Sequence, residues 1–359
     1  MFKSYVASVL ALILCCPAYG VAAQAQSTSA IPLPLATTTP ASATSTQAPV
    51  SAKATPVTLA AIVVTAADTE PHIWTYQKGR SKILVLGTIY PEPKGLDFIP
   101  FSINSAISAS GAVIGPPWFN FGVHVNLFNL VSVWRDSKDA TRLPDGKHLA
   151  DVVPATLMQR WKPLKAYYLP YNHKVEKMLP MYAGWKLYDA VLDRSGVAVK
   201  ASIPKLIERE AGKHGMKVVD ASFHWTVKDP SEAAHAFTPD PQADLACFKT
   251  ILDGIQGLPG ASRTMASAWA SGDVATMRTF LQTHKLTPPC WQRLTDQALA
   301  KEQRLDLEQR EREAWLTAVN TAAAQHSVIF TTASVQEIFA HTGRIGWLLG
   351  EGYTKPKMP

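Results

Sequence analysis

Two short apolar segments near opposite ends of the chain each run directly into a turn. Ile83–Leu86 is followed by Gly87–Tyr90, and Val328–Thr332 is followed by Ala333–Val335. Apolar runs of this length, rich in β-branched residues and bounded by turn residues, are typical of buried strands. The two segments therefore predict a strand that ends in a turn near each end of the folded part of the chain.

The region around the first turn predicts a β-α-β unit. Residues 73–89 alternate around Gly79-Arg80 and predict a hairpin. Helical periodicity over Ile99–Ser110 and the apolar run Ala112–Ile114 predict a helix and a further strand. Parallel strands of such a unit end at one edge of the sheet, so we expect Tyr90 and Gly115 to share the carboxyl edge, where open α/β sheets bind ligands.

A helical cap is predicted for Leu149–Leu192. Proline interrupts helices, so Pro163, Pro170 and Pro180 predict several short helices in this region. Tryptophan and tyrosine rings offer flat faces with a polar tip, and here they could line a groove for a glycan or peptide, with core packing as the alternative role. The aromatic residues concerned are Trp161, Tyr167, Tyr168, Tyr171, Tyr182, Trp185 and Tyr188.

The second half of the chain is predominantly helical. Ile203–Lys213 predicts an amphipathic helix that leads into a strand at Met216–Val219. Ala246–Leu281 predicts a helical hairpin, in which Gly272 ends one helix and Asp273 caps the next. A long charged helix is expected over Ala298–Ala324 and a final helix near Ile345–Leu349. The expected buried residues of the long helix are Leu305, Leu307, Trp315 and Val319.

The N-terminal region predicts export. Residues 1–25 combine Lys3, the apolar run Val6–Cys16 and small residues before Gln26, which are the three parts of a secretory signal peptide. Residues 26–68, rich in Ala, Ser, Thr and Pro, predict a disordered linker. We therefore expect a periplasmic or secreted chain with one domain at residues 69–359. No later segment approaches the ~18 consecutive apolar residues of a membrane-spanning helix, so no transmembrane segment is expected in the mature chain.

Cysteine content and charge constrain the chemistry further. Cys247 and Cys290 are the cysteines that remain after signal cleavage, and in an oxidising compartment we expect them to form a disulfide, with two buried thiols as the alternative. The formal net charge of +7 is modest for 359 residues and is spread along the chain. No basic-aromatic nucleic-acid motif occurs, so no nucleic acid partner is expected.

Several short motifs occur in a fixed order along the folded part. They are Leu86-Gly87-Thr88-Ile89, Trp269-Ala270-Ser271-Gly272-Asp273, Trp315 on an Arg- and Glu-rich helix, and Gly352-Tyr353-Thr354. From about Ile73 to the C terminus the chain resembles the TraB/GumN family, whose Tiki-like members are regarded as metal-dependent peptidases. The resemblance implies an α/β (α+β) fold: a mixed β-sheet core similar to that of erythromycin esterase and ChaN, flanked by helices.

The family pattern is Gly-x-x-His twice, with a glutamate after the strand that follows the first helix. Here the first pattern falls on Gly87 and Tyr90, the second on Thr332 and Val335, and the acidic position on Gly115. Phenol, isopropyl and hydrogen do not replace imidazole and carboxylate as ligands of a divalent metal. The resemblance therefore implies a vestigial metal site, with no catalytic residue and no cofactor.

These observations favour a non-catalytic binding protein of the cell envelope, whose partner is an unidentified peptide, envelope polymer or protein. The alternative is a metal-dependent hydrolase or peptidase that holds Zn²⁺ or Mn²⁺ through relocated ligands such as Glu337 and His341. A solvated helix pair is the simpler interpretation of those two residues. Arg312 lies near the position of an Arg-Asn element of the family, and surface ion pairing of Arg310 and Arg312 with neighbouring glutamates is its simpler role. A purely structural envelope protein is a third possibility.

Overall fold

A computed structural model of the chain describes residues 70–96, 99–123, 141–198, 202–227, 240–284, 290 and 301–354. The predicted signal peptide at 1–25 and the whole of the predicted linker at 26–68 lie outside these residues. Among the helices that are described, none combines the length and the apolar composition needed to cross a membrane.

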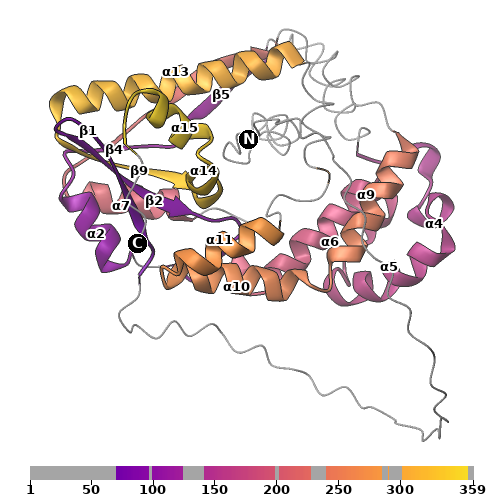
Figure 1. The fold of residues 1–359 in the computed structure, drawn as a ribbon. Coiled ribbons are helices and arrows are strands. Elements are labelled where there is room, and N and C mark those ends of the chain that lie inside the picture. Colours follow the sequence, from indigo (N-terminus) through magenta and orange to yellow (C-terminus); the bar gives the residue numbers. More distant parts are fainter. Residues whose placement is uncertain are drawn as a thin grey trace, which may run out of the picture.

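A five-stranded mixed sheet forms the centre of the fold, with the strand order β1-β2-β9-β4-β7. Strand β1 is antiparallel to β2, whereas β2, β9, β4 and β7 run parallel to one another. The predicted α/β fold with a mixed sheet and flanking helices is therefore confirmed (Figure 1). The strands are β1 Ile73–Lys78, β2 Ser81–Thr88, β4 Ala112–Ile114, β7 Val218–Val219 and β9 Val328–Ser334.

The two strand-and-turn segments that stand out in the sequence are direct neighbours in space. Strands β2 and β9 pair in parallel, with Leu86 opposite Thr332 and Thr88 opposite Ser334. Strand β9 is buried at every position but the first, and β2 at four of its eight positions, as expected for central strands covered on both faces. The turns after Thr88 and Ser334 therefore leave the same edge of the sheet.

The predicted hairpin, helix and strand at the start of the domain are also present. Strands β1 and β2 pair from Ile73 opposite Leu86 to Lys78 opposite Ser81, across a two-residue turn at Gly79-Arg80. Gly79 has φ +56°, a conformation that glycine adopts without steric cost. The chain then forms helix α2 and returns through β4, which pairs with β9.

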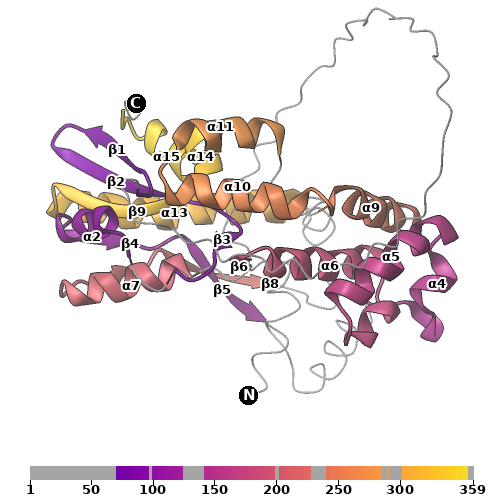
Figure 2. The ribbon, with the colours of Figure 1, turned by 90° about the horizontal axis from the view of Figure 1, so that it is seen from below.

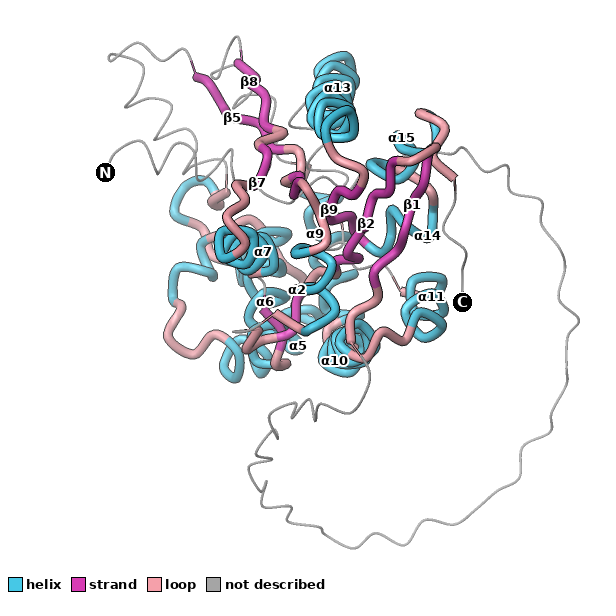
Figure 3. Tube along the Cα trace, turned by 90° about the vertical axis from the view of Figure 1, so that its left-hand side faces the viewer, coloured by secondary structure: helices cyan, strands magenta, loops and turns pink. Residues whose placement is uncertain are grey.

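Helices cover both faces of the sheet. Figure 3 shows β9, β2 and β1 between α14 and α15 on one side and α2 and α7 on the other. Helix α13 runs along one side of the molecule (Figure 1). It packs on β9, β4, α15 and the strand β8 (Ser222–Val227). The bounds are α2 Phe101–Ser108, α7 Ile203–Lys213, α10 Leu258–Ala270, α11 Val274–Thr283, α13 Lys301–Gln325, α14 Val335–Ala340 and α15 Gly343–Gly350.

The predicted helical cap lies at one end of the molecule, beyond α10 (Figures 1 and 2). Its main packing is between α6 and α9 and between α5 and α6, with the rings of Trp161 and Phe248 5.3 Å apart. Of the aromatic residues named in the sequence analysis, Trp161 and Tyr188 are buried and pack in the core, whereas Tyr167 and Tyr171 are exposed. The predicted region Leu149–Leu192 forms α4 Leu149–Val152, α5 Ala155–Tyr168, the 3₁₀ helix η2 His173–Lys177 and α6 Pro180–Arg194. Helix α9 Pro241–Gly254, outside those predicted bounds, packs on α6 and completes the cap.

Two local predictions are wrong. Pro163 does not end a helix but lies inside α5, where it is exposed and its missing N–H costs one helical hydrogen bond. On α13, Trp315 and Val319 are buried as predicted, whereas Leu305 is 57% exposed and Leu307 is partly exposed. The N-terminal half of α13 therefore carries apolar residues without burying them among the described residues.

Two small sheets and one short helix complete the described elements. Strand β3 (Glu92–Pro93) pairs with β6 (Val197–Ala198), and β5 (Trp118–Val123) pairs in parallel with β8 (Ser222–Val227). The 3₁₀ helix η1 spans Pro144–Gly146.

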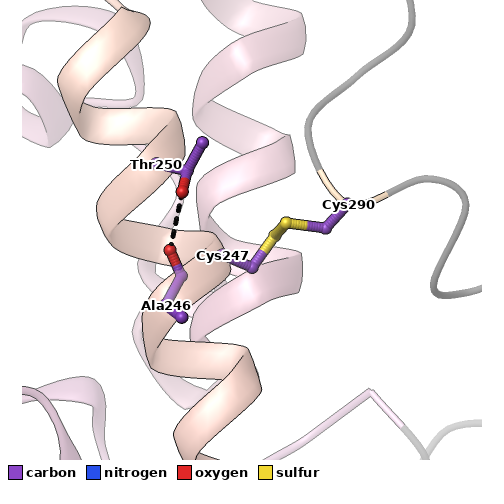
Figure 4. The surroundings of a disulfide bond; sticks show 4 residues. All are labelled: Ala246, Cys247, Thr250 and Cys290. Atoms are coloured by element: carbon purple, nitrogen blue, oxygen red, sulfur yellow. Dashed lines mark hydrogen bonds between the residues drawn. A yellow bond between two sulfur atoms is a disulfide. The ribbon is translucent and has the colours of Figure 1, made fainter. Parts of the chain in front are cut away.

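Cys247 and Cys290 form the predicted disulfide (Figure 4). Cys247 lies on α9 and is buried, and the bond closes a loop with a sequence separation of 43 residues. The cap helix α9 is thereby tied to the segment that follows α11.

Candidate functional site

The carboxyl edge of the four parallel strands brings the predicted site positions to one side of the sheet. Tyr90 follows β2, Gly115 follows β4 and Val335 follows β9. Gly115 donates its N–H to the carbonyl of Val219 at 3.0 Å, which joins the end of β4 to the end of β7. The expectation that Tyr90 and Gly115 share this edge is confirmed.

The first turn is packed by apolar side chains. A Cβ at Gly87 would overlap the indole of Trp74 and would lie 2.9 Å from Val335 Cγ1. The Trp269 indole N–H donates to the carbonyl of Gly87 at 2.6 Å, in a buried position. Val335 itself is only 1% exposed. Gly87 and Val335 therefore belong to a tightly packed, mainly apolar contact between β1, β2, α10 and α14.

Gly115 also lies in a confined position. It is buried, and a Cβ there would lie 3.3 Å from Val218 Cγ1 and 3.4 Å from the carbonyl oxygen of Val219. Pro116 and Pro117 follow it directly, and Pro117 is buried. A longer side chain at this position would have to displace β7.

Glu337 lies beside this edge and forms a buried ion pair with Arg344. Arg344 Nη2 lies 2.5 Å from Oε2, and Arg344 Nε and the Arg344 backbone N–H each donate to Oε1 at 3.0 Å. Arg344 Nη1 donates to the carbonyl of Thr332 at 2.9 Å, which ties α15 to the end of β9. Burial would raise the pKa of Glu337, but Arg344 and the backbone donors hold that pKa below its usual value.

The same carboxylate caps helix α14. The Ser334 N–H donates to Glu337 Oε2 at 2.8 Å, and the Glu337 N–H donates to Ser334 Oγ at 3.1 Å. This reciprocal arrangement is a capping box. The simpler interpretation of Glu337 as half of a solvated helix pair is wrong, because Glu337 is 3% exposed and His341 lies just past the end of α14 with φ +54°.

A second carboxyl group, that of Glu311 on α13, faces this ion pair; the residue is partly exposed, but its Oε1 atom is buried. Burial raises the pKa of Glu311 to about 7; Arg344 lowers that pKa, and Glu337 and Glu308 raise it. Glu311 Oε1 has no hydrogen-bond partner among the described residues. Because Arg344 is already engaged by Glu337, a charged Glu311 would leave this cluster with an excess negative charge.

The arginines of α13 lie on its solvent side. Arg312 is exposed, and Arg310 Nε donates to Asp306 Oδ1 at 3.0 Å. Arg310 therefore makes its surface ion pair with Asp306 rather than with the three glutamates that the sequence suggested. Glu311, one of those three, points toward Arg344 in the interior.

An open groove, hereafter the α13 groove, lies between α13 and the segment from β7 to β8. Its volume is about 540 Å³. One wall is the continuous segment Val219–His224, and the other is a single face of α13. The α13 residues recur at three- and four-residue intervals, as one helical face requires. They are Arg310, Glu313, Ala314, Thr317, Ala318 and Thr321.

The α13 groove begins at the carboxyl edge. Asp220 follows β7 directly and accepts hydrogen bonds from the backbone N–H and the hydroxyl of Ser222, at 2.8 and 2.7 Å. His224 and Glu313 add an imidazole and a second carboxylate to the walls. No sequence motif singles out these residues, although an acidic residue directly after the predicted strand at Met216–Val219 is a usable signal for a ligand site. Within the described part of the chain, no three His, Cys, Asp or Glu side chains gather closely enough to hold a metal ion.

A family model described as the TraB/PrgY/gumN family matches residues 72–331. The chain belongs to this family. The match starts at β1, includes the cap and α13, and ends within β9, so it covers most of the described fold and confirms the resemblance seen in the sequence. Thr332, Val335 and the Glu337–Arg344 pair lie just beyond the matched residues. No curated protein and no solved structure matches the chain significantly.

Proposed function

We propose that this TraB/PrgY/gumN-family protein is an exported binding protein of the cell envelope whose ligand occupies the α13 groove. The observation that carries the proposal is the position of this groove: it opens at the carboxyl end of the parallel strand β7, beside the strand-end position Gly115, whose N–H is bonded to Val219 of the groove wall. Ligands of open α/β sheets bind outside the carboxyl ends of the strands. Export rests on the signal-peptide pattern of residues 1–25.

The contacts at the strand ends support binding over metal chemistry. Val335 packs against Gly87, and the backbone of Gly115 is bonded to β7, so neither position offers a ligand atom from its side chain. Glu337, one of the two relocated ligands considered for a hydrolase, accepts hydrogen bonds at both carboxylate oxygens from Arg344 and Ser334. A metal ion at Glu337 would have to displace Arg344 into a buried, unpaired position, which is costly.

The chemistry of the groove walls favours a hydroxyl-rich polymer as the ligand. Asp220 and Glu313 offer carboxylate acceptors, Arg310 offers fixed donors, and Ser222 and Thr317 can both donate and accept. Phe223 adds a partly exposed aromatic face. Acceptors, donors and a flat ring along an open groove suit a glycan strand of the envelope better than a small apolar molecule.

Two arginines of one helix provide a matched test. Arg310 lines the groove, whereas Arg312, two positions further along α13, is exposed outside it. The exported chain is incubated with purified peptidoglycan sacculi, and the bound fraction after sedimentation is measured for the wild type, Arg310→Ala and Arg312→Ala. Loss of a charge-assisted hydrogen bond in Arg310→Ala is expected to weaken binding about tenfold, and Arg312→Ala to bind like the wild type.

Equal binding by the two variants, or a wild-type chain that stays in the supernatant, would contradict a glycan ligand in the α13 groove. A ligand of another class, a peptide or a protein, would then be sought with the same pair of variants. Thermal unfolding of both variants checks that neither change alters the fold, since both side chains are exposed.

A further inference from the structure

A second surface, at the opposite end of the molecule, carries exposed tyrosine and lysine side chains. It is formed by the C-terminal end of α5, the loop between α5 and η2, and η2 itself, in the cap. Tyr171 is 92% exposed and Tyr167 is 61% exposed, the first and third highest values among the large hydrophobic side chains that are exposed in the described part of the chain. We refer to Tyr167, Tyr171, His173, Lys174 and Lys177 as the cap surface.

The tyrosines are held by a cation rather than by an apolar cover. The Arg194 guanidinium, at the end of α6, lies 4.8 Å from the ring centroid of Tyr167 and 5.6 Å from that of Tyr168. The two rings meet edge to face with centroids 4.7 Å apart. Cation–π and edge contacts of this kind fix the ring positions while leaving Tyr167 open to solvent.

A shallow groove of about 500 Å³ runs along the same loop. Its walls are the consecutive residues Tyr168 to Lys174, and Leu169, Pro170 and Tyr171 give it a largely apolar lining. No carboxylate side chain lines this groove, whereas Asp220 and Glu313 line the α13 groove. A glycan would find few acceptors for its hydroxyl groups here.

The charge of the cap surface is positive. Lys174 and Lys177 are three residues apart on a 3₁₀ helix, so their side chains lie on one face, and both are exposed. Neither forms an ion pair with a described residue. The one acidic residue of η2, Glu176, lies 4.0 Å from Lys165 of α5. Two lysines next to exposed tyrosines therefore remain available to an anionic partner.

We propose that the cap surface docks the protein onto an anionic phospholipid bilayer. Lysines near a membrane surface are attracted by anionic head groups, and tyrosine is favoured at head-group depth because its ring is apolar and its hydroxyl is polar. The apolar groove lining at Leu169 and Pro170 would be shielded from water in that position. Surface docking requires no spanning helix, and it leaves the α13 groove, on a different part of the molecule, open to its own ligand.

Vesicle flotation tests this docking directly. The exported chain is mixed with phosphatidylcholine vesicles, either pure or containing about one third phosphatidylglycerol, and the floated fraction is measured. Lys174→Glu/Lys177→Glu is expected to reduce binding to the anionic vesicles by about tenfold or more, since each basic residue contributes near the surface. Tyr171→Ser is expected to reduce binding to a smaller extent, and added salt should weaken wild-type binding.

Lys205→Glu, an exposed lysine on α7 at the far end of the molecule, is the matched control and should float like the wild type. Arg310→Ala should also float like the wild type, which separates docking from the ligand of the α13 groove. If Lys205→Glu and the double variant lost vesicle binding equally, net charge alone would explain the loss, and this would overturn the proposal. So would binding of the cap surface to sacculi but not to vesicles, or no binding to anionic vesicles at low salt.

Discussion

The guanidinium of Arg344 and the carboxylate of Glu337 form a nearly fully buried ion pair, with Nη2 and Oε2 2.5 Å apart. The pair joins the start of α14 to α15, and through the carbonyl of Thr332 it joins both helices to the end of β9. A carboxylate that accepts four hydrogen bonds serves to hold the fold at the carboxyl edge. This relationship accounts for a Glu337 that could otherwise be taken for a metal ligand.

Arg344→Met should destabilise the protein strongly. The change leaves Glu337 buried without its counter-charge, and breaking a buried pair in this way typically costs about 3–5 kcal/mol. Chemical denaturation measures the free energy of unfolding. Arg160→Ala, which removes one half of the exposed pair Arg160–Asp253, is the control and should cost at most about 1 kcal/mol. A similar small cost for both variants would contradict the structural role given to Arg344.

Glu311 should make the protein less stable at alkaline pH. Its pKa is raised to about 7 in the folded state, so the folded protein holds this proton more tightly than the unfolded chain does. The resulting stabilisation is fully present below the unfolded pKa near 4.5 and is lost as the pH rises through about 7, a difference of about 2–3 kcal/mol. Glu311→Gln should remove most of this dependence in urea unfolding between about pH 5 and about pH 8.

Glu337 should make the protein less stable at acidic pH, because its folded-state pKa is lowered. The stabilisation from Glu337 is present above the unfolded pKa and is lost as the pH falls through the folded pKa. The wild type should therefore be most stable between the two transitions. An unchanged alkaline slope in Glu311→Gln would show that another group is responsible.

Gly87→Ala should destabilise the contact between β1, β2, α10 and α14. The added methyl group would overlap Trp74 and crowd Val335, and overpacking of this kind typically costs about 1–3 kcal/mol. Gly260→Ala on α10 is the matched control, because a Cβ there has no heavy atom within 4 Å. That change should be neutral or stabilising by up to about 1 kcal/mol. Thermal unfolding of the two variants in parallel tests the packing, and equal effects would contradict it.

Removal of the disulfide should lower stability by about 4 kcal/mol on the chain-entropy estimate for a loop of this length. The bond links Cys247 and Cys290 across 43 residues. Cys247→Ser/Cys290→Ser and the reduced wild type should show the same loss in unfolding experiments. Reducing agent should not lower the stability of the double variant further. If reducing agent left the stability of the wild type unchanged, the disulfide would be contradicted.

Local sequence signals were sufficient for much of the fold. The hairpin around Gly79, the helix Ile203–Lys213 and the Gly272–Asp273 interruption all depend on turn, capping and periodicity rules that act over a few residues. The mixed sheet was predicted from the family resemblance, which rested on motifs at both ends of the domain. The predicted burial of Leu305 was wrong because an apolar stripe on a helix becomes a buried face only where another element covers it.

The candidate sites depended on contacts that no local pattern encodes. Glu337 and Arg344 are seven residues apart on two different helices, so the i, i+4 rule pointed to His341 instead. The α13 groove is formed by segments about ninety residues apart, Val219–His224 and the Arg310 face of α13. Only Asp220, directly after a predicted strand, carried a signal that the sequence could have revealed.

The metal content of the purified protein distinguishes a binding protein from a metal-dependent hydrolase. The protein is produced with Zn²⁺ and Mn²⁺ supplementation, purified without chelators and measured by elemental analysis, alongside His341→Ala. We predict no stoichiometric metal in either protein, because Glu337 is engaged by Arg344 and because Gly115 and Val335 provide no ligand atoms from their side chains. One Zn²⁺ or Mn²⁺ per chain in the wild type, lost in His341→Ala, would contradict the account and support a hydrolase with relocated ligands.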